Sequence, residues 1–139
     1  MPRALSDTDY QRLLAFRDGL RRFLHWSEQQ AVQIGITPAQ HQLLLAIRGH
    51  PRGAPSIGDV ADHLLVRHHS AVGLVDRAEQ AGLVERRIDP TDHRQVQLHL
   101  TARGSQRLAR LAAAHHDELD SLKLNPPPGW SFLAQDRDL

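Results

Sequence analysis

The chain has 139 residues and a formal net charge of +1 with histidine neutral. This length suits one domain or slightly more, with a core of its own. The absence of cysteine excludes disulfides, thiolate metal sites and thiol redox sensing. No apolar run approaches the ~18 residues of a membrane span, and the N-terminal sequence MPRALSDTDY lacks the apolar core of a signal peptide. A soluble cytoplasmic protein is therefore expected.

The first predicted helix begins at Ser6, which has Asp9 at the spacing of a capping box, and it ends at Gly35. Its apolar surface is wider than one stripe and includes large side chains such as Phe16 and Trp26. A single neighbouring domain covers only one side of such a helix, so we expect a second partner to cover the other.

A second helix is predicted from Thr37 to Gly49, with Pro38 at its first position and Gln40 completing a capping box. Its core-facing side chains are Leu43, Leu44, Ala46 and Ile47. The loop that follows, HPRGAP, leads to the next helix, and we expect a short extra strand near Ala54.

Two further helices follow in close succession. The first begins with another capping box, Ser56 and Asp59, and the second covers residues 67–81 and ends where Gly82 permits a left-handed turn. The apolar stripe of the first helix comprises Val60, Ala61, Leu64 and Leu65, and that of the second comprises Ala71, Leu74, Val75 and Ala78. The outward face of the second helix carries Arg67, His68, Ser70, Gly73 and Arg77.

Beyond Gly82 the period of the apolar residues changes from helical to alternating, which predicts strands at residues 83–88 and 96–100. Residues 89–94 form a polar turn between them. Helix, turn, helix and a two-stranded ribbon make a winged helix-turn-helix, a mainly α fold with a small antiparallel β-wing. In such a fold the second helix enters a DNA major groove and the wing flanks it.

Thr101 caps a last long helix, which the sequence NPPPG at residues 125–129 cannot continue. We expect the tail with Trp130, Phe132 and Leu133 to dock on the protein. The apolar stripe of this helix comprises Leu108, Leu111, Ala112, Leu119 and Leu122. The predicted organisation is an N-terminal dimerisation helix at 1–34, a winged helix-turn-helix at 36–101, a C-terminal dimerisation helix at 102–123 and a Pro-rich tail at 124–139.

Arginine is concentrated in the second half of the chain. Residues 67–110 contain eight arginines against five acids, a local excess of three. A modest basic footprint suits a DNA binder that acts as a dimer, since two copies double it. An ordinary solvated surface explains the same charges equally well.

From Ile36 onward the chain resembles the MarR family of bacterial transcriptional regulators. The matching stretches are ITPAQHQLLLAI, SIGDVADHLLV and LVDRAEQAGLVERRIDPTDHRQVQLHLTARG, the last being the most specific. The resemblance implies a homodimeric winged-helix protein, usually a repressor, that binds a pseudo-palindromic operator in double-stranded DNA. It also implies release of the operator when a small aromatic or phenolic effector binds, with no other cofactor.

The chain departs from the family in two places. Family members usually finish with two long helices that build the dimer interface with the first, whereas NPPPG replaces the start of the last one here. Dimerisation through residues 10–32 and 108–122 is still expected. Family members also often place a long polar residue where Gly73 lies and a small hydroxyl residue where His69 lies, so this chain is expected to have its own operator.

The wing carries the Asp-x-Arg that the family uses on DNA, matched here by Asp92 and Arg94. Arg94 can extend into a narrow minor groove, where A·T-rich sequence concentrates negative potential, and Asp92 can hold its guanidinium in a bidentate pair. The alternative is a hairpin ion pair worth at most ~1 kcal/mol. The predicted DNA-binding residues are Arg67, His68, His69, Ser70, Gly73, Arg77, Arg86, Asp92 and Arg94.

An effector cavity is predicted between the dimerisation helices and the DNA-binding region. Its expected lining is Trp26, Ile34, His41, Leu45 and His115. Filling such a cavity would bias the spacing of the two DNA-binding regions.

Other functions remain as alternatives. A zinc or other metal-responsive regulator could use Glu28, His41, His115 and His116, but adjacent helical histidines point about 100° apart and zinc needs three or four convergent ligands. A winged helix used only for protein contacts would lose the basic helix face and the wing arginine, which this chain keeps. An enzyme is not expected, because no nucleophile elbow, phosphate loop or HExxH motif is present.

Overall fold

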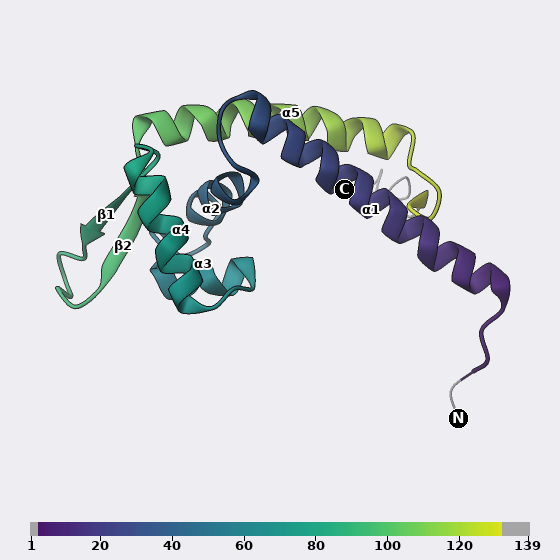
Figure 1. The fold of residues 1–139 in the computed structure, drawn as a ribbon, viewed down its shortest axis with the longest axis horizontal. Helices are drawn as coiled ribbons and strands as arrows, with labels where there is room; N and C mark the ends of the chain where they lie inside the picture. The colour runs from purple at the N-terminus through teal and green to yellow at the C-terminus, as the bar shows by residue number, and fades with distance from the viewer. Residues whose placement is uncertain (1–2, 132–139) are drawn as a thin grey trace. The chain divides into compact units, whose positions relative to one another are not determined.

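The computed structural model describes residues 3–131, and its elements follow the order of a winged helix-turn-helix (Figure 1). The helices are α1 (Asp7–Gln33), α2 (Pro38–Arg48), α3 (Ile57–Leu64), α4 (His68–Gln80) and α5 (Ala102–Leu124), and the strands are β1 (Val84–Ile88) and β2 (Val96–Leu100). The strands pair antiparallel, with Val84 opposite Leu100. The predicted fold class is confirmed. Over the described residues, no helix is both long and apolar enough to cross a membrane.

The chain forms two compact units. The winged-helix unit is Ala31–Leu111, and it contains α2, α3, α4 and both strands. The helical unit is Met1–Gln30 together with Ala112–Leu139, and it contains most of α1 and the second half of α5.

The starts of α1, α2 and α3 are set by the side-chain caps that the sequence predicts. The reciprocal pairs are Ser6 with Asp9, Thr37 with Gln40 and Ser56 with Asp59. In the third pair the backbone N–H of Ser56 donates to Asp59 Oδ2 at 2.9 Å. That bond holds the pKa of the Asp59 carboxyl below its ordinary value, although slight burial opposes the shift. Each pair satisfies N–H groups that a helix start otherwise leaves without partners.

The core of the winged-helix unit forms where α2, α3, α4 and the strands pack together. All four residues predicted to face inward from α4 are buried. The largest fully buried side chains are Leu43, Leu44, Leu98, Leu111, Val60, Val75, Val84 and Pro55. Because its apolar side is used in this core, α4 turns its polar side to solvent.

Leu65 does not belong to the apolar stripe of α3, so that part of the prediction is wrong. The residue is the C-cap of α3, with φ 55° and ψ 42°, and it is 92% exposed. Its backbone N–H donates to Ala61 and Asp62 carbonyls to close the helix. The turn between α3 and α4 therefore requires a left-handed residue, a conformation that costs a leucine roughly 1–2 kcal/mol.

The short extra strand expected near Ala54 is also absent from the described residues. The Pro55 carbonyl accepts a hydrogen bond from the Leu98 N–H at 2.9 Å, but the residues around it have no strand conformation. A proline has no N–H to return to β2, so the contact remains a single bond.

The start of α5 packs directly on the end of α4. Thr101 Oγ1 donates to the Gly82 carbonyl at 2.6 Å and accepts from the Gly104 N–H at 3.0 Å. A Cβ built on Gly104 would overlap the Leu83 carbonyl oxygen, which itself accepts from the Thr101 N–H. The glycine is required by this close backbone approach.

Gly104→Ala is expected to lower the free energy of unfolding by about 1–3 kcal/mol, because the methyl group must displace a fixed backbone carbonyl. Urea unfolding followed by circular dichroism measures the change. Gly58→Ala is the matched control, since its Cβ would meet Ser56 Oγ at 3.6 Å, an ordinary contact, and alanine favours a helix by up to ~1 kcal/mol. Equal midpoints for Gly104→Ala and the parent would contradict this account of the junction.

Candidate nucleic-acid interface

The outward face of α4 is polar and open to solvent. The exposed residues on it are Arg67, His68, His69, Ser70 and Arg77, and Gly73 is half-buried among them. Arg77 Nη1 lies 3.3 Å from the point where a Gly73 Cβ would stand, so the guanidinium lies over the glycine. The predicted recognition residues therefore share one accessible surface.

The N-terminus of α4 has no side-chain cap. Its N-cap is Arg67, whose side chain accepts no hydrogen bond from the first turn, whereas α2, α3 and α5 start with capped N–H groups. The free N–H groups and the helix dipole favour an anion at this end, and a DNA phosphate is such an anion.

The tip of the wing is ordered by Asp89. Its carboxylate accepts from both the N–H and the hydroxyl of Thr91 at 2.8 Å. The backbone bond, then the hydroxyl bond, hold the pKa of Asp89 below its ordinary value, so the carboxylate stays charged and the turn stays closed near neutral pH. Further along, the Gln95 N–H donates to the Asp92 carbonyl at 3.0 Å.

Arg94 extends from this turn with its side chain 93% exposed. Asp92 Oδ1 accepts from the Arg94 N–H at 3.1 Å and from its Nε at 3.4 Å. The predicted bidentate pair is therefore wrong: a carboxylate two residues away in a tight turn reaches Nε and the backbone rather than the fork of the guanidinium. The terminal nitrogens of Arg94 take no part in this pair, and with the side chain 93% exposed they are accessible to a ligand.

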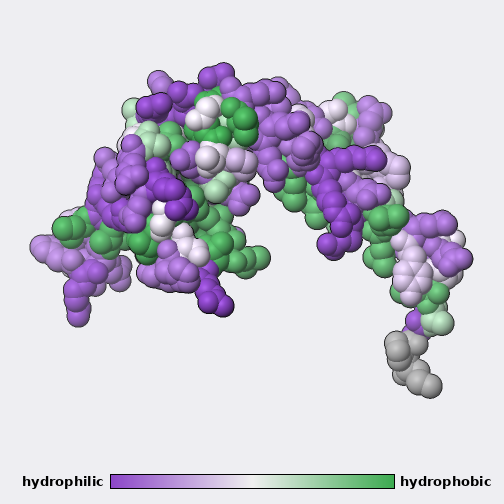
Figure 2. Space-filling model, viewed as in Figure 1, coloured by the Kyte–Doolittle hydropathy of each residue, from purple (hydrophilic) through white to green (hydrophobic). Residues whose placement is uncertain are grey.

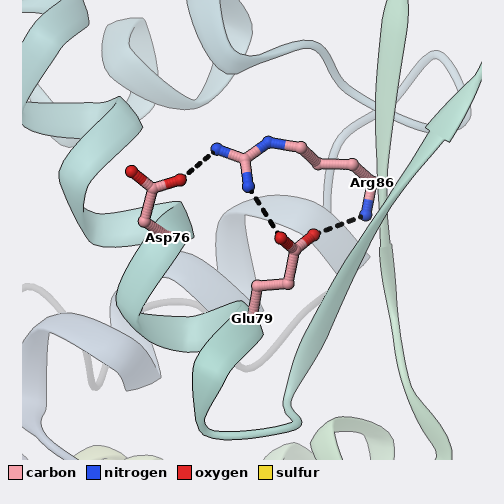
Figure 3. Close-up of polar contacts among 3 residues, drawn as sticks. All are labelled: Asp76, Glu79 and Arg86. Carbon is pink, nitrogen blue, oxygen red and sulfur yellow. Dashed lines mark hydrogen bonds and ion pairs between the residues drawn. The ribbon is translucent and has the colours of Figure 1, made fainter.

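Arg86 ties the wing to α4 (Figure 3). Its Nη2 lies 2.6 Å from Asp76 Oδ1, its Nη1 lies 3.0 Å from Glu79 Oε1, and its N–H donates to Glu79 Oε2 at 3.2 Å. Burial alone would lower the pKa of Arg86, but these two carboxylates raise it above the ordinary arginine value. Its predicted contact with DNA remains a prediction; the role visible in the structure is to position β1 on α4.

One open hollow of about 620 Å³ brings the start of α4, the wing and the start of α3 together. Its lining includes His68 and Arg94, with Ser56, Gly58 and Asp59 from the α3 end. The α3 end was not among the predicted DNA-binding residues. The sequence did identify Ser56 as the start of a helix, but it gave no sign that this helix start lies beside the wing.

The predicted effector residues are distributed over the two units. In the helical unit, Trp26 and His115 are in contact, with ring centroids 4.8 Å apart, and His115 Nε2 lies 2.6 Å from Ser27 Oγ. The other three residues belong to the winged-helix unit, where His41 is buried, Ile34 is half-buried and Leu45 is exposed.

A second open hollow, of about 700 Å³, lies within the winged-helix unit. It contains none of the predicted effector residues. Its lining includes Ile47, Arg48, His50, Leu98 and His99.

The candidate ligands of the metal-responsive alternative form no metal-binding cluster within the described residues. No group of three or more histidine, aspartate or glutamate side chains suited to a metal ion occurs between residues 3 and 131. The closest pairing of histidines that the sequence did not point to is His50 Nδ1 with His63 Nε2, at 3.0 Å. It is a side-chain bond between the loop after α2 and α3.

Part of the chain, including most of the winged-helix unit, is similar to known proteins. Residues 34–95 match the model of the MarR family. A protein of Thauera aromatica described as transcriptional regulatory for the hcr operon is 38% identical over 80 residues, covering 58% of this chain and 47% of that protein. The HTH-type transcriptional repressor MdtR of Bacillus subtilis (strain 168) is 29% identical over 79 residues, covering 57% and 50%. The chain thus matches about half the length of these relatives.

The fold is also that of a solved DNA complex. The structure of the MepR–DNA complex from S. aureus superposes with a TM-score of 0.68 at 20% identity, covering 79% of this chain and 78% of that one. At this identity the similarity establishes the fold alone. The matched family and these proteins are transcription regulators, not enzymes.

Arg86→Ala is expected to lower the free energy of unfolding by about 1–2 kcal/mol, because it leaves two carboxylates on α4 without their partner. Its side chain is only 26% exposed. Arg87→Ala is the control, since that side chain is 57% exposed and, among residues 3–131, forms an ion pair with Glu85 alone. Its loss should cost a few tenths of a kcal/mol. Chemical unfolding measures the free energy of unfolding of both variants. Equal losses of stability in the two would contradict the positioning role of Arg86.

Proposed function

We propose that the chain is a member of the MarR family, whose model matches residues 34–95, and that it is a sequence-specific DNA-binding transcriptional regulator. The observation that carries the proposal is the polar face of α4, exposed beside a wing whose Arg94 is 93% exposed. In this proposal α4 enters the major groove and His69 and Ser70 contact base edges. Arg94 enters the neighbouring minor groove.

We propose repression as its mode of regulation. The relative MdtR is a transcriptional repressor, and MepR has been solved bound to DNA. A winged helix that occupies a promoter by itself blocks access to it, whereas activation needs a further contact with the transcription machinery.

The regulator is proposed to act as a homodimer on a pseudo-palindromic operator. A single winged-helix unit covers one half-site, and a twofold pair places two α4 helices roughly 34 Å apart, one turn of DNA. The helical unit carries the surface for such pairing. Large apolar side chains exposed on α1 include Tyr10, Leu13, Leu14, Leu20 and Leu24.

A small phenolic or aromatic effector is proposed to control release. Its support is the resemblance to the family and the packing of Trp26, Phe23 and His115, which offers aromatic faces and an imidazole in one place. An effector acts only through a difference in affinity between the DNA-bound and free conformations. The proposal therefore requires that binding of the effector weakens binding of the operator, and the reverse.

Substitutions in α4 and in the wing should affect DNA binding differently. His69→Ala or Ser70→Ala should change which bases are preferred, at roughly 1–3 kcal/mol per lost contact. Arg94→Ala should weaken all sites, most where the flanks are A·T-rich, and reduce the slope of log affinity against log salt by about 1. Selection of duplexes from a random pool, followed by titrations at several salt concentrations, measures both effects.

Arg12→Ala is the control for these titrations, since Arg12 is exposed on α1 outside the winged-helix unit. Its salt slope should equal that of the parent. Binding that does not depend on salt, or a selection without an enriched sequence, would rule out the proposed function and favour a winged helix used for protein contacts.

The effector proposal is tested by thermal unfolding with a panel of phenolic acids. A compound at about 100 times its Kd should add about 2.7 kcal/mol to the stability of the protein and weaken operator binding. His115→Ala should abolish the thermal shift, whereas His116→Ala, which changes the neighbouring exposed residue, should retain it. A panel that gives no shift, or a shift that His115→Ala leaves intact, would contradict the proposal.

A further inference from the structure

We propose that the hollow of about 700 Å³ in the winged-helix unit binds a small phosphate monoester with an apolar body, and that this ligand acts on the start of α3 through His50. We call it the basic hollow. Its lining comes from the end of α2, the loop after it, β2 and the first turns of α5. Ligand binding here does not depend on the proposed function, whereas the effect on operator binding rests on it.

The polar side of the basic hollow is basic. Arg48 ends α2, His50 lies in the loop after it, His99 lies on β2 and Ser105 lies on α5. Among the described residues that line the hollow, none is acidic. The side chains of Arg48 and His99 form no ion pair with any of residues 3–131. The hollow therefore presents positive charge that suits an anion.

An acid on the neighbouring strand is already paired. Glu85 lies opposite His99 in the register of the sheet, but its carboxylate is held in an ion pair by Arg87. The charge of the basic hollow is thus not neutralised from across the wing.

The number of donors favours a phosphate over a carboxylate. A guanidinium alone satisfies the two oxygens of a carboxylate with two parallel hydrogen bonds. The basic hollow adds to Arg48 an imidazole on β2 and a hydroxyl on α5, and a phosphate monoester has three terminal oxygens to receive such donors. The polar lining therefore points to a phosphate group.

The rest of the lining calls for an apolar body on the same ligand. Ile47 and Leu98 are buried, Leu100 is half-buried, and Ala109 lies one turn after Ser105 on α5. Figure 2 shows a similar mixture of hydrophobic and hydrophilic residues over one face of the winged-helix unit. Small-molecule sites combine apolar surface with a few polar groups in roughly 300–1,000 Å³. The basic hollow meets both conditions.

The tail after α5, by contrast, is packed on its own unit. Trp130 Nε1 donates to the Phe16 carbonyl at 2.8 Å, and a Cβ on Gly19 would stand 2.7 Å from that nitrogen. The predicted docking of Trp130 is confirmed, while Phe132 and Leu133 lie outside the described residues. The indole is engaged within the helical unit, whereas the polar side chains of the basic hollow are open to a ligand.

His50 joins the basic hollow to the start of α3. Its side chain is only 14% exposed, and both ring nitrogens have neighbours on α3. Nδ1 lies 3.0 Å from His63 Nε2, and Nε2 lies 3.7 Å from Asp59 Oδ2. The same Asp59 oxygen accepts from the Ser56 N–H at 2.9 Å. A phosphate beside His50 therefore competes with the Asp59 carboxylate for one imidazole.

This competition reaches the proposed DNA surface, because the start of α3 lines the hollow of about 620 Å³. Ser56 and Asp59 share that lining with His68 and Arg94. When a phosphate in the basic hollow attracts His50, Asp59 is left with less positive charge beside it. Its negative charge then opposes the approach of DNA phosphates. The ligand is therefore expected to weaken operator binding.

Binding is measured by isothermal titration calorimetry on the full chain, with phenyl phosphate as the probe. Inorganic phosphate keeps the acidic group without the apolar body, and benzoate keeps the body with a two-oxygen acid. Phenyl phosphate should bind at least about tenfold more tightly than either of them. Equal binding of inorganic phosphate or benzoate, or no heat with phenyl phosphate, would overturn the assigned ligand class.

Variants of the lining test the place of binding. Arg48→Ala should raise the dissociation constant of phenyl phosphate about tenfold or more, because it removes the guanidinium. Ala109→Phe should also raise it, since the larger side chain fills the apolar side of the hollow. Arg52→Ala is the matched control, an exposed arginine of the loop after α2 outside the lining, and should leave the constant unchanged. Circular dichroism checks that each variant is folded.

Equal dissociation constants for Arg48→Ala and Arg52→Ala would overturn the site. The effect on α3 is then measured with a duplex selected by the parent protein, whose dissociation constant saturating phenyl phosphate should raise about fivefold. Asp59→Asn keeps an oxygen for the Ser56 N–H and removes the charge, so it should retain probe binding and lose this effect. Arg48→Ala should lose both, which excludes simple competition by the probe at the DNA surface. An effect of equal size in Asp59→Asn and the parent would overturn the link through His50.

The outcomes separate this inference from the proposed function. A parent that selects no duplex overturns the proposed function, while calorimetry still decides on the basic hollow. A DNA-binding parent that gives no heat with phenyl phosphate overturns the basic hollow alone. Heat that disappears in His115→Ala and persists in Arg48→Ala would assign the probe to the effector site of the helical unit, which also overturns the basic hollow.

Discussion

α4, the wing and the start of α5 are joined at a single backbone junction in the winged-helix unit. The Thr101 hydroxyl connects the carbonyl that ends α4, at Gly82, to the N–H of Gly104 that starts α5. The Leu83 carbonyl receives the Thr101 N–H at 3.1 Å, which brings the end of β2 to the beginning of β1. A few backbone atoms and one hydroxyl thus set the directions of α4, the wing and α5. Gly82 and Gly104 permit the close approach of these elements.

A second constraint aligns the wing with α4. The carboxylates of Asp76 and Glu79, one turn apart on α4, hold Arg86 from two sides. The root of the wing is thereby fixed, while Arg94 at its tip remains free to extend. Ordering the root during folding, rather than on contact with a duplex, removes an entropic cost from binding. In the proposed function, α4 and Arg94 enter adjacent grooves. A wing that is fixed at its root and exposed at its tip suits that task.

Local patterns predicted the caps and the buried faces, because both depend on spacing within a few residues. Features that need distant partners were missed. Gly19 has no local explanation until Trp130, far along the sequence, is found over it. Arg86 looks like a free cation until the turn at Gly82 sets it against α4. Leu65 matched the apolar stripe of α3, because periodicity does not register that a turn needs a left-handed residue and that no glycine is there to provide it.

The charges of the recognition surface follow from which arginines have partners. Arg86 and Arg87 are held by carboxylates, whereas Arg67 and Arg77 form no ion pair within residues 3–131. Arg77 lies over Gly73, the position where the family often has a long polar side chain. Arg77, one turn after Gly73, thus places its guanidinium on the surface where Gly73 has no side chain. The departure at Gly73 therefore changes the angle from which a cation reaches the groove, without removing the cation, and this is a physical reason to expect an operator of the chain's own.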